Sequence, residues 1–182
     1  MDNITKSIYL IKSFDEIEKI YNNLIADQYN IDDAKNIFNY IIHRCYNFNC
    51  SKICEDYFLK YGANNESNDK DKTIDFYLYN IPFDLKVTVF PQKLFNERYS
   101  YDLTSREGKN KLIQWMYANQ STEKRFHLEN RLFIVCSKLD KKSDFEQIEN
   151  KIKIFVDYFK QKPFNEIEIG REKLISDIIW VE

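Results

Sequence analysis

In the first third of the chain, apolar residues recur every three or four positions, which is the spacing of an amphipathic helix. The first such stripe begins after Ser13, a candidate N-cap whose capping box Glu16 would complete. A second helix is expected to begin at Asp32 or Asp33. The pattern therefore predicts a helical N-terminal region.

The second stripe loses its phase at residues 47–49, because the apolar positions before and after this point fall on different faces of one continuous helix. The pattern therefore predicts a break there and a third helix over residues 50–61. Gly62 supplies a C-terminal stop signal for this helix. The polar stretch 64–72 is expected to be a loop.

Residues 73–89 alternate between apolar and polar side chains, which is the pattern of half-buried strands. The alternation predicts two strands joined by a two-residue turn at Tyr79 and Asn80. Asparagine tolerates the positive φ angle that such a turn requires. With this turn, Phe76 lies opposite Phe83.

The same register brings two carboxylates together. Asp75 is predicted to lie opposite Asp84 in a non-hydrogen-bonded pair, where Cα atoms approach to about 4.5 Å, and Lys86 shares their face. A bound cation, a nearby ammonium group or protonation of one acid must offset the repulsion. A competing register, with a loop at 80–83, would hold the acids roughly 13 Å apart. We prefer the first register because it extends the apolar alternation to Ile81.

Beyond the hairpin, the pattern predicts further helices and strands. Residues 92–105 are expected to be irregular, with a short strand over 98–103 as an alternative. The later predicted elements are helices over 107–119 and 143–161, a strand buried on both faces at 131–136, and strands at 164–169 and 174–181. The fold class expected is α/β (α+β), with a central mixed sheet flanked by helices after the helical N-terminal region.

Asp75, followed on the next strand by Asp84-Leu85-Lys86, resembles the motif of the PD-(D/E)xK nuclease superfamily. Proteins of that superfamily have a restriction-endonuclease-like fold with an αβββαβ core, and the expected order of elements here is loosely the same. The resemblance implies that Asp75 and Asp84 bind Mg²⁺ or Mn²⁺, with a backbone carbonyl near Leu85 as a further ligand. It also implies that Lys86 contacts the attacking water or the scissile phosphate. Ile74 stands where the family usually has proline.

The resemblance also implies accessory residues. The first helix of that fold often carries one more acid, and Glu55 lies at the corresponding place, although its position off the apolar stripe favours exposure to solvent. Gln114 and Tyr117 resemble a glutamine–tyrosine pair of one branch of the superfamily, at a spacing of three rather than four, and a core position is the alternative for Tyr117. His127 is a candidate general base.

Composition narrows the class of protein without identifying it. A chain of 182 residues with 43% hydrophobic and 16% aromatic content predicts a folded single domain over 1–182 rather than a disordered chain. Its helical part would cover 1–62, and its α/β part, with the candidate site, would cover 73–182. No segment approaches the ~20 apolar residues of a membrane span. Since the N-terminus also lacks the pattern of a signal peptide, a cytoplasmic location is expected.

The four cysteines are Cys45, Cys50, Cys54 and Cys136, and without a secretory signal they are not expected to form disulfides. On one continuous helix, His43, Cys50 and Cys54 would share a face and suit a zinc ion. The predicted break removes that shared face. Buried core cysteines are therefore favoured.

The net charge of −2 gives no overall attraction to nucleic acid, so a DNA-binding enzyme would need local basic patches. Candidate patches lie within 106–111, 124–131 and 138–142. The expected function is metal-dependent hydrolysis of phosphodiester bonds in DNA. The alternatives are a non-catalytic member of the same fold, another α/β interaction module, and a zinc-binding regulator. The oligomeric state is left open, a homodimer included.

Overall fold

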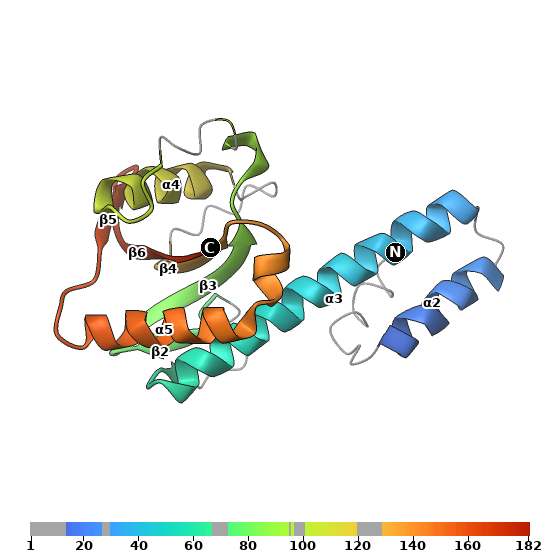
Figure 1. Ribbon diagram of the computed structural model, residues 1–182, viewed down its shortest axis with the longest axis horizontal. Helices are drawn as coiled ribbons and strands as arrows, with labels where there is room; N and C mark the ends of the chain where they lie inside the picture. The colour runs from blue at the N-terminus through green and yellow to red at the C-terminus, as the bar shows by residue number, and fades with distance from the viewer. Residues whose placement is uncertain (1–13, 27–29, 67–72, 95, 97–100, 120–128) are drawn as a thin grey trace. The chain divides into compact units, whose positions relative to one another are not determined.

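The computed structural model of the 182-residue chain describes residues 14–26, 30–66, 73–94, 96, 101–119 and 129–182 (Figure 1). The chain divides into two compact units, Met1–Lys52 and Ile53–Glu182, and each is described by itself. No helix in the described ranges is long and apolar enough to cross a membrane.

The N-terminal unit contains α2 (Phe14–Ala26) and the first part of α3 (Ile31–Lys60). Helix α3 begins slightly before the predicted position, because Asn30 Oδ1 accepts a hydrogen bond from Asp32 N at 3.0 Å and so satisfies one of the first free N–H groups. The apolar cluster of this unit is formed by buried Ile17, Ile41 and Cys45.

Helix α3 is continuous, so the predicted break at residues 47–49 is wrong. The two halves of the helix belong to different compact units and contribute to separate apolar clusters, with Cys45 in one cluster and Cys54 and Phe58 in the other. The shift in the apolar stripe therefore marks a change of packing partners along one helix. All four cysteines are buried, as predicted, whereas His43 is exposed.

The second unit is built on a six-stranded mixed sheet with the order β1-β2-β3-β4-β6-β5. The strands are β1 (Asn64–Asn65), β2 (Phe76–Leu78), β3 (Ile81–Val89), β4 (Arg131–Cys136), β5 (Glu166–Ile169) and β6 (Glu172–Val181). Strands β3, β4 and β6 are parallel to one another, whereas β1–β2, β2–β3 and β5–β6 are antiparallel pairs. The predicted central mixed sheet is thus confirmed.

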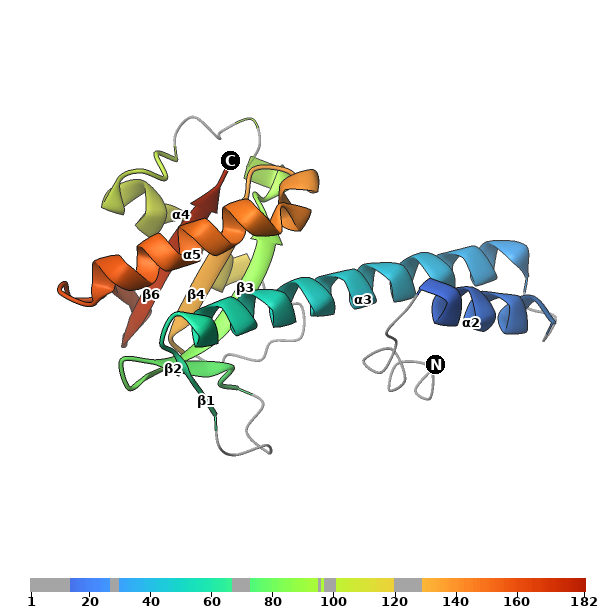
Figure 2. The ribbon, with the colours of Figure 1, turned by 60° about the horizontal axis from the view of Figure 1, so that its bottom comes forward.

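Two helices make the crossovers that parallel neighbours require: α4 (Arg106–Asn119) joins β3 to β4, and α5 (Phe145–Phe159) joins β4 to β6. Figures 1 and 2 show α4 on one side of the sheet and α5 on the other. Alternate residues of β4 enter the two apolar clusters, Leu132 toward α5 and Phe133 toward α4. This two-sided burial explains the continuous apolar run of that strand. From α3 to β4 the elements run in the order αβββαβ, which the resemblance implied. The first of the three strands, β1, lies at residues 64–65, where the sequence had predicted a loop.

The predicted hairpin turn is confirmed. Tyr79 and Asn80 have φ angles of 52° and 65°, as a two-residue turn with positive φ at both positions requires. The ladder pairs Phe76 with Phe83, the predicted register. In the region 92–105, the described residues form no strand, and residues 97–100 lie outside the described ranges.

Candidate functional site

Asp75 lies immediately before β2, where the ladder with β3 ends. Its N–H donates to Phe83 O at 2.9 Å, and its Oδ2 accepts from Leu85 N at 2.6 Å. The described ladder stops at Phe76, one residue short of the Asp75–Asp84 pair that the sequence predicted. The carboxylate of Asp75 thus takes the place of a strand carbonyl and extends the contact to β3 by one hydrogen bond.

Asp84 is buried in the middle of the sheet, with a relative exposure of 7%. Its Oδ2 accepts from Arg131 Nε at 2.8 Å, and its Oδ1 forms an ion pair with Lys86. All three side chains lie on the α4 face, because Arg131 is the parallel partner of Asp84 and Phe133 is the partner of Lys86. The ammonium that the sequence predicted is present, and a guanidinium joins it.

Tyr117 of α4 packs against this ion cluster. Arg131 Cζ lies 5.1 Å from the ring centroid of Tyr117, within the range of a cation–π contact. The hydroxyl donates to Glu129 O at 2.6 Å. Burial is the main cause that raises the pKa of Tyr117 to about 12, so its phenol is neutral at physiological pH. Tyr117 therefore positions Arg131, which in turn positions Asp84.

Asn130, the residue before β4, forms hydrogen bonds to both β3 and β6 next to Asp84. Its carbonyl accepts from Asp84 N at 3.0 Å, its Nδ2 donates to Pro82 O at 3.2 Å, and its Oδ1 accepts from Ile175 N at 2.8 Å. Because Asn130 joins β3 and β6 next to Arg131, the backbone around Asp84 is held from both sides. Such support keeps a binding side chain in one geometry.

Asn130 was not predicted from the sequence, and Arg131 was predicted only as one member of a basic patch. A signal for Arg131 was present: it is the first residue of a strand that is otherwise buried and apolar. A charge at such a position needs a partner. Which acid would provide it depends on the pairing of β3 with β4, which the local pattern does not specify.

The oxygen atoms near Asp75 suit a hard divalent cation. Since the N–H of Leu85 points to Asp75, the Leu85 carbonyl leaves the strand on the same side. Two carboxylates and a carbonyl are ligands of the kind that Mg²⁺ accepts together with water. A metal at Asp84 would have to replace one cation, and Lys86, with its side chain 42% exposed, is held less firmly than Arg131 at 16%.

The described ranges contain no group of three or more His, Cys, Asp or Glu side chains arranged to hold a metal. Glu55 is buried, with 8% exposure, so its predicted exposure to solvent is wrong. Glu55 lies next to Cys54, which belongs to the apolar cluster of the second unit, so the buried face of α3 is wider there than the apolar stripe predicts.

The accessory pair on α4 does not come together. Gln114 is exposed on α4, whereas Tyr117 is turned toward Arg131, so the two point to different surroundings. His127 lies outside the described residues. The residues brought together are therefore Asp84, Lys86, Arg131 and Tyr117, with Asp75 joined to them through the backbone of Leu85.

Comparisons with protein-family models, with curated proteins and with solved structures found no match. The function of this cluster is therefore inferred from its own geometry and chemistry. Three of its properties matter for that inference: a buried acid with a second acid beside it, two adjacent cations, and the hydrogen bonds that hold the backbone around Asp84.

Proposed function

We propose that this protein is a nuclease that uses Mg²⁺ or Mn²⁺ to hydrolyse phosphodiester bonds of DNA. One observation carries the proposal: the Asp75 carboxylate, at the start of β2, is hydrogen-bonded to the backbone between Asp84 and Lys86 on β3. The αβββαβ order of elements from α3 to β4 supports the proposal, because the resemblance to the PD-(D/E)xK superfamily implies a core of that order.

In this proposal Asp75, Asp84 and the Leu85 carbonyl would hold the metal. A bound divalent ion supplies a Lewis acid and lowers the pKa of a bound water. Lys86 exchanges its contact with Asp84 for the scissile phosphate or the attacking water, which its partial exposure permits. Arg131 stays with Asp84 and fixes the direction of that carboxylate.

A second candidate function has an observation of its own in its favour. Both oxygens of Asp84 are engaged by cationic side chains, so the cluster neutralises its own charge. A non-catalytic protein of the same α+β architecture, serving as an interaction module, would keep such a cluster for stability alone. The proposed nuclease requires a bound metal ion for activity, whereas the interaction module does not, so a test of metal dependence distinguishes the two functions.

The test is cleavage of plasmid DNA by the full chain in Mg²⁺, in Mn²⁺ and in EDTA, with an RNA substrate in a parallel series. The variants are Asp75→Asn and Lys86→Ala, and the matched control is Lys153→Ala, an exposed lysine of α5. We expect cleavage by the wild type and the control only with metal. The two site variants should lose about a hundredfold or more in rate, as expected for groups that act on the reacting centre.

Equal cleavage by wild type and both site variants would contradict the proposal, as would cleavage that persists in EDTA. If no protein cleaves, and Mg²⁺ leaves the melting temperature of the wild type unchanged, the non-catalytic alternative is favoured. The melting temperature is informative because a ligand that binds only the native state must stabilise it.

A further inference from the structure

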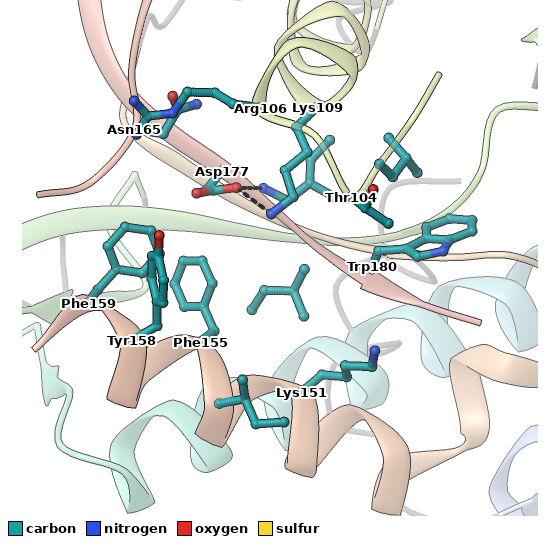
Figure 3. Close-up of a pocket in the computed structure, with 14 residues that line it drawn as sticks. Thr104, Arg106, Lys109, Lys151, Phe155, Tyr158, Phe159, Asn165, Asp177 and Trp180 are labelled. Carbon is teal, nitrogen blue, oxygen red and sulfur yellow. Dashed lines mark hydrogen bonds and ion pairs between the residues drawn. The ribbon is translucent and has the colours of Figure 1, made fainter. Parts of the chain in front are cut away.

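A cavity of about 470 Å³ lies along one edge of the sheet, beside β6 and between α4 and α5 (Figure 3). Its volume falls within the ~300–1,000 Å³ of sites that bind small ligands. The edge is open because β5 pairs only with residues 172–175 of β6, and among the described strands only β4 pairs with the rest.

The backbone at this edge is closed to an added strand. Asp177 Oδ1 accepts from Ile178 N at 2.7 Å and from Lys109 Nζ at 3.1 Å, the two bonds drawn at the centre of Figure 3. The Ile178 N–H is thus already hydrogen-bonded to the Asp177 carboxylate, so it cannot donate to an added strand. Charged side chains of this kind protect edge strands from pairing. The cavity therefore suits a compact ligand better than an extended peptide.

The lining of the cavity carries two uncompensated positive charges. Arg106 of α4 and Lys151 of α5 form no hydrogen bond or ion pair with any described residue, whereas Lys109 is neutralised by Asp177. Figure 3 shows Arg106 approaching from the helix on one side of β6 and Lys151 from the helix on the other. An anionic ligand would find cations on both walls.

Large apolar side chains line the same cavity. Tyr158 is 52% exposed and Ile154 is 58% exposed. Phe155, Phe159 and Trp180 bring the aromatic rings in the lining to four. A planar aromatic ligand can stack on such rings, and stacking is worth about 1–3 kcal/mol per base in single-strand binding proteins.

Asn165 of the cavity wall is held in one orientation by hydrogen bonds. Its Nδ2 donates to Asn110 Oδ1 at 2.7 Å and to Ser176 O at 2.8 Å, which fixes the orientation of the amide. Its Oδ1 is buried and has no donor among the described residues. Asn165 therefore shapes the wall, while the cationic side chains and the aromatic rings supply the groups that a ligand can contact.

We propose that this cavity binds a nucleotide, either free or as an unpaired unit of a nucleic-acid strand. The ring faces would contact the base, and Arg106 and Lys151 would contact phosphate. This combination of cations and stacking surfaces is typical of sequence-tolerant single-strand binding. The proposal goes beyond the nuclease proposal, since it requires neither a metal nor Lys86.

The test is fluorescence anisotropy of a labelled short single-stranded DNA, titrated with the full chain in EDTA. A mononucleotide serves as competitor in one arm and a short polyglutamate peptide in another. The variants are Arg106→Gln, Lys151→Gln and Tyr158→Leu. Lys153→Gln is the matched control, because Lys153 lies on the same helix but does not line the cavity.

We expect saturable binding that each of the three cavity variants weakens about tenfold, while the control leaves it unchanged. Each lost cation should also reduce the slope of log affinity against log salt by about 0.7. If the mononucleotide competes with the labelled DNA, a free nucleotide is a sufficient ligand. If it does not compete, the ligand is a nucleotide within a strand. Both outcomes support the site. Because the titration contains EDTA and its variants lie outside the candidate metal site, a failed nuclease proposal leaves this result intact.

Three results would overturn the proposal. The first is the absence of saturable binding to either nucleic-acid probe. The second is equal affinity for the cavity variants and the Lys153→Gln control, since binding would then occur elsewhere. The third is competition by polyglutamate as strong as that by the nucleotide, which would show that only negative charge is recognised.

Discussion

Arg131 donates its Nε–H to Asp84 Oδ2 at 2.8 Å, across two parallel strands and with both side chains largely buried. This ion pair stabilises the sheet, and Asp84 is also a candidate metal ligand. A substitution at Asp84 is therefore expected to change both the free energy of unfolding and the metal-dependent activity.

Asp84→Ala should destabilise the protein by about 3–5 kcal/mol, because it leaves the buried guanidinium of Arg131 without its carboxylate. The measurement is the free energy of unfolding from urea denaturation. Asp140→Ala is the control, since it removes a pair with Lys138 in which both side chains are about two-thirds exposed, and exposed pairs are worth about 1 kcal/mol or less. If both substitutions cost the same, the Asp84–Arg131 pair is not the buried interaction described here.

The two roles of Asp75 can be told apart by two substitutions. Asp75→Asn keeps an oxygen that accepts from Leu85 N, whereas Asp75→Ala leaves that N–H without its acceptor. We expect the alanine variant to lose about 1–3 kcal/mol of unfolding free energy and the asparagine variant to lose less. Both should lose metal-dependent cleavage. An asparagine variant that cleaves like the wild type would contradict a metal-binding role for Asp75.

The pKa of Tyr117, raised to about 12 mainly by burial, predicts a pH dependence of stability. The native state favours the neutral phenol, so its contribution is fully present below pH ~10, the ordinary tyrosine value, and is lost as the pH rises toward 12. The wild type should lose more unfolding free energy than Tyr117→Phe across this window. Other tyrosines titrate in both proteins and cancel in the comparison. Equal losses would show that Tyr117 is not buried beside Arg131.

Gly108 marks a close approach between α4 and the loop before it. A Cβ at this position would lie 2.1 Å from the carbonyl oxygen of Asp102, while the Gly108 N–H donates to Ser105 Oγ at 3.1 Å. Gly108→Ala should therefore lower the free energy of unfolding by about 1–3 kcal/mol or more, and the loss should appear as a lower melting temperature. Gly170→Asn is the control, since nothing lies within 4 Å of its Cβ and asparagine tolerates the φ of 66°. A neutral Gly108→Ala substitution would contradict the packing described.

The hairpin could be predicted from sequence because its determinants are local. The period of two fixes which residues face the core, and a two-residue turn fixes the register, so Phe76 was placed correctly opposite Phe83. The same local signals predicted that Asp84 and Lys86 share a face. They did not reveal that the ladder ends before Asp75, because that end depends on a hydrogen bond that the Asp75 side chain accepts from Leu85 N.

The predictions that failed depend on packing between distant segments. The break in α3 was inferred from one apolar stripe, but two compact units bury different faces of the same helix. Glu55 was expected to face solvent but is buried within the second unit. Arg131 contacts Asp84 because β3 and β4 pair in parallel, which brings together residues 47 positions apart. No pattern within one segment contains that information.

The most direct test of the nuclease proposal is the position of Mn²⁺, located by anomalous scattering in crystals of the protein grown with the metal. We expect one peak within coordination distance of oxygens of both Asp75 and Asp84, with Lys86 displaced from Asp84 and Arg131 retained. An intact Asp84–Lys86 pair with no anomalous peak beside Asp75, at a Mn²⁺ concentration that supports cleavage in solution, would contradict the nuclease proposal.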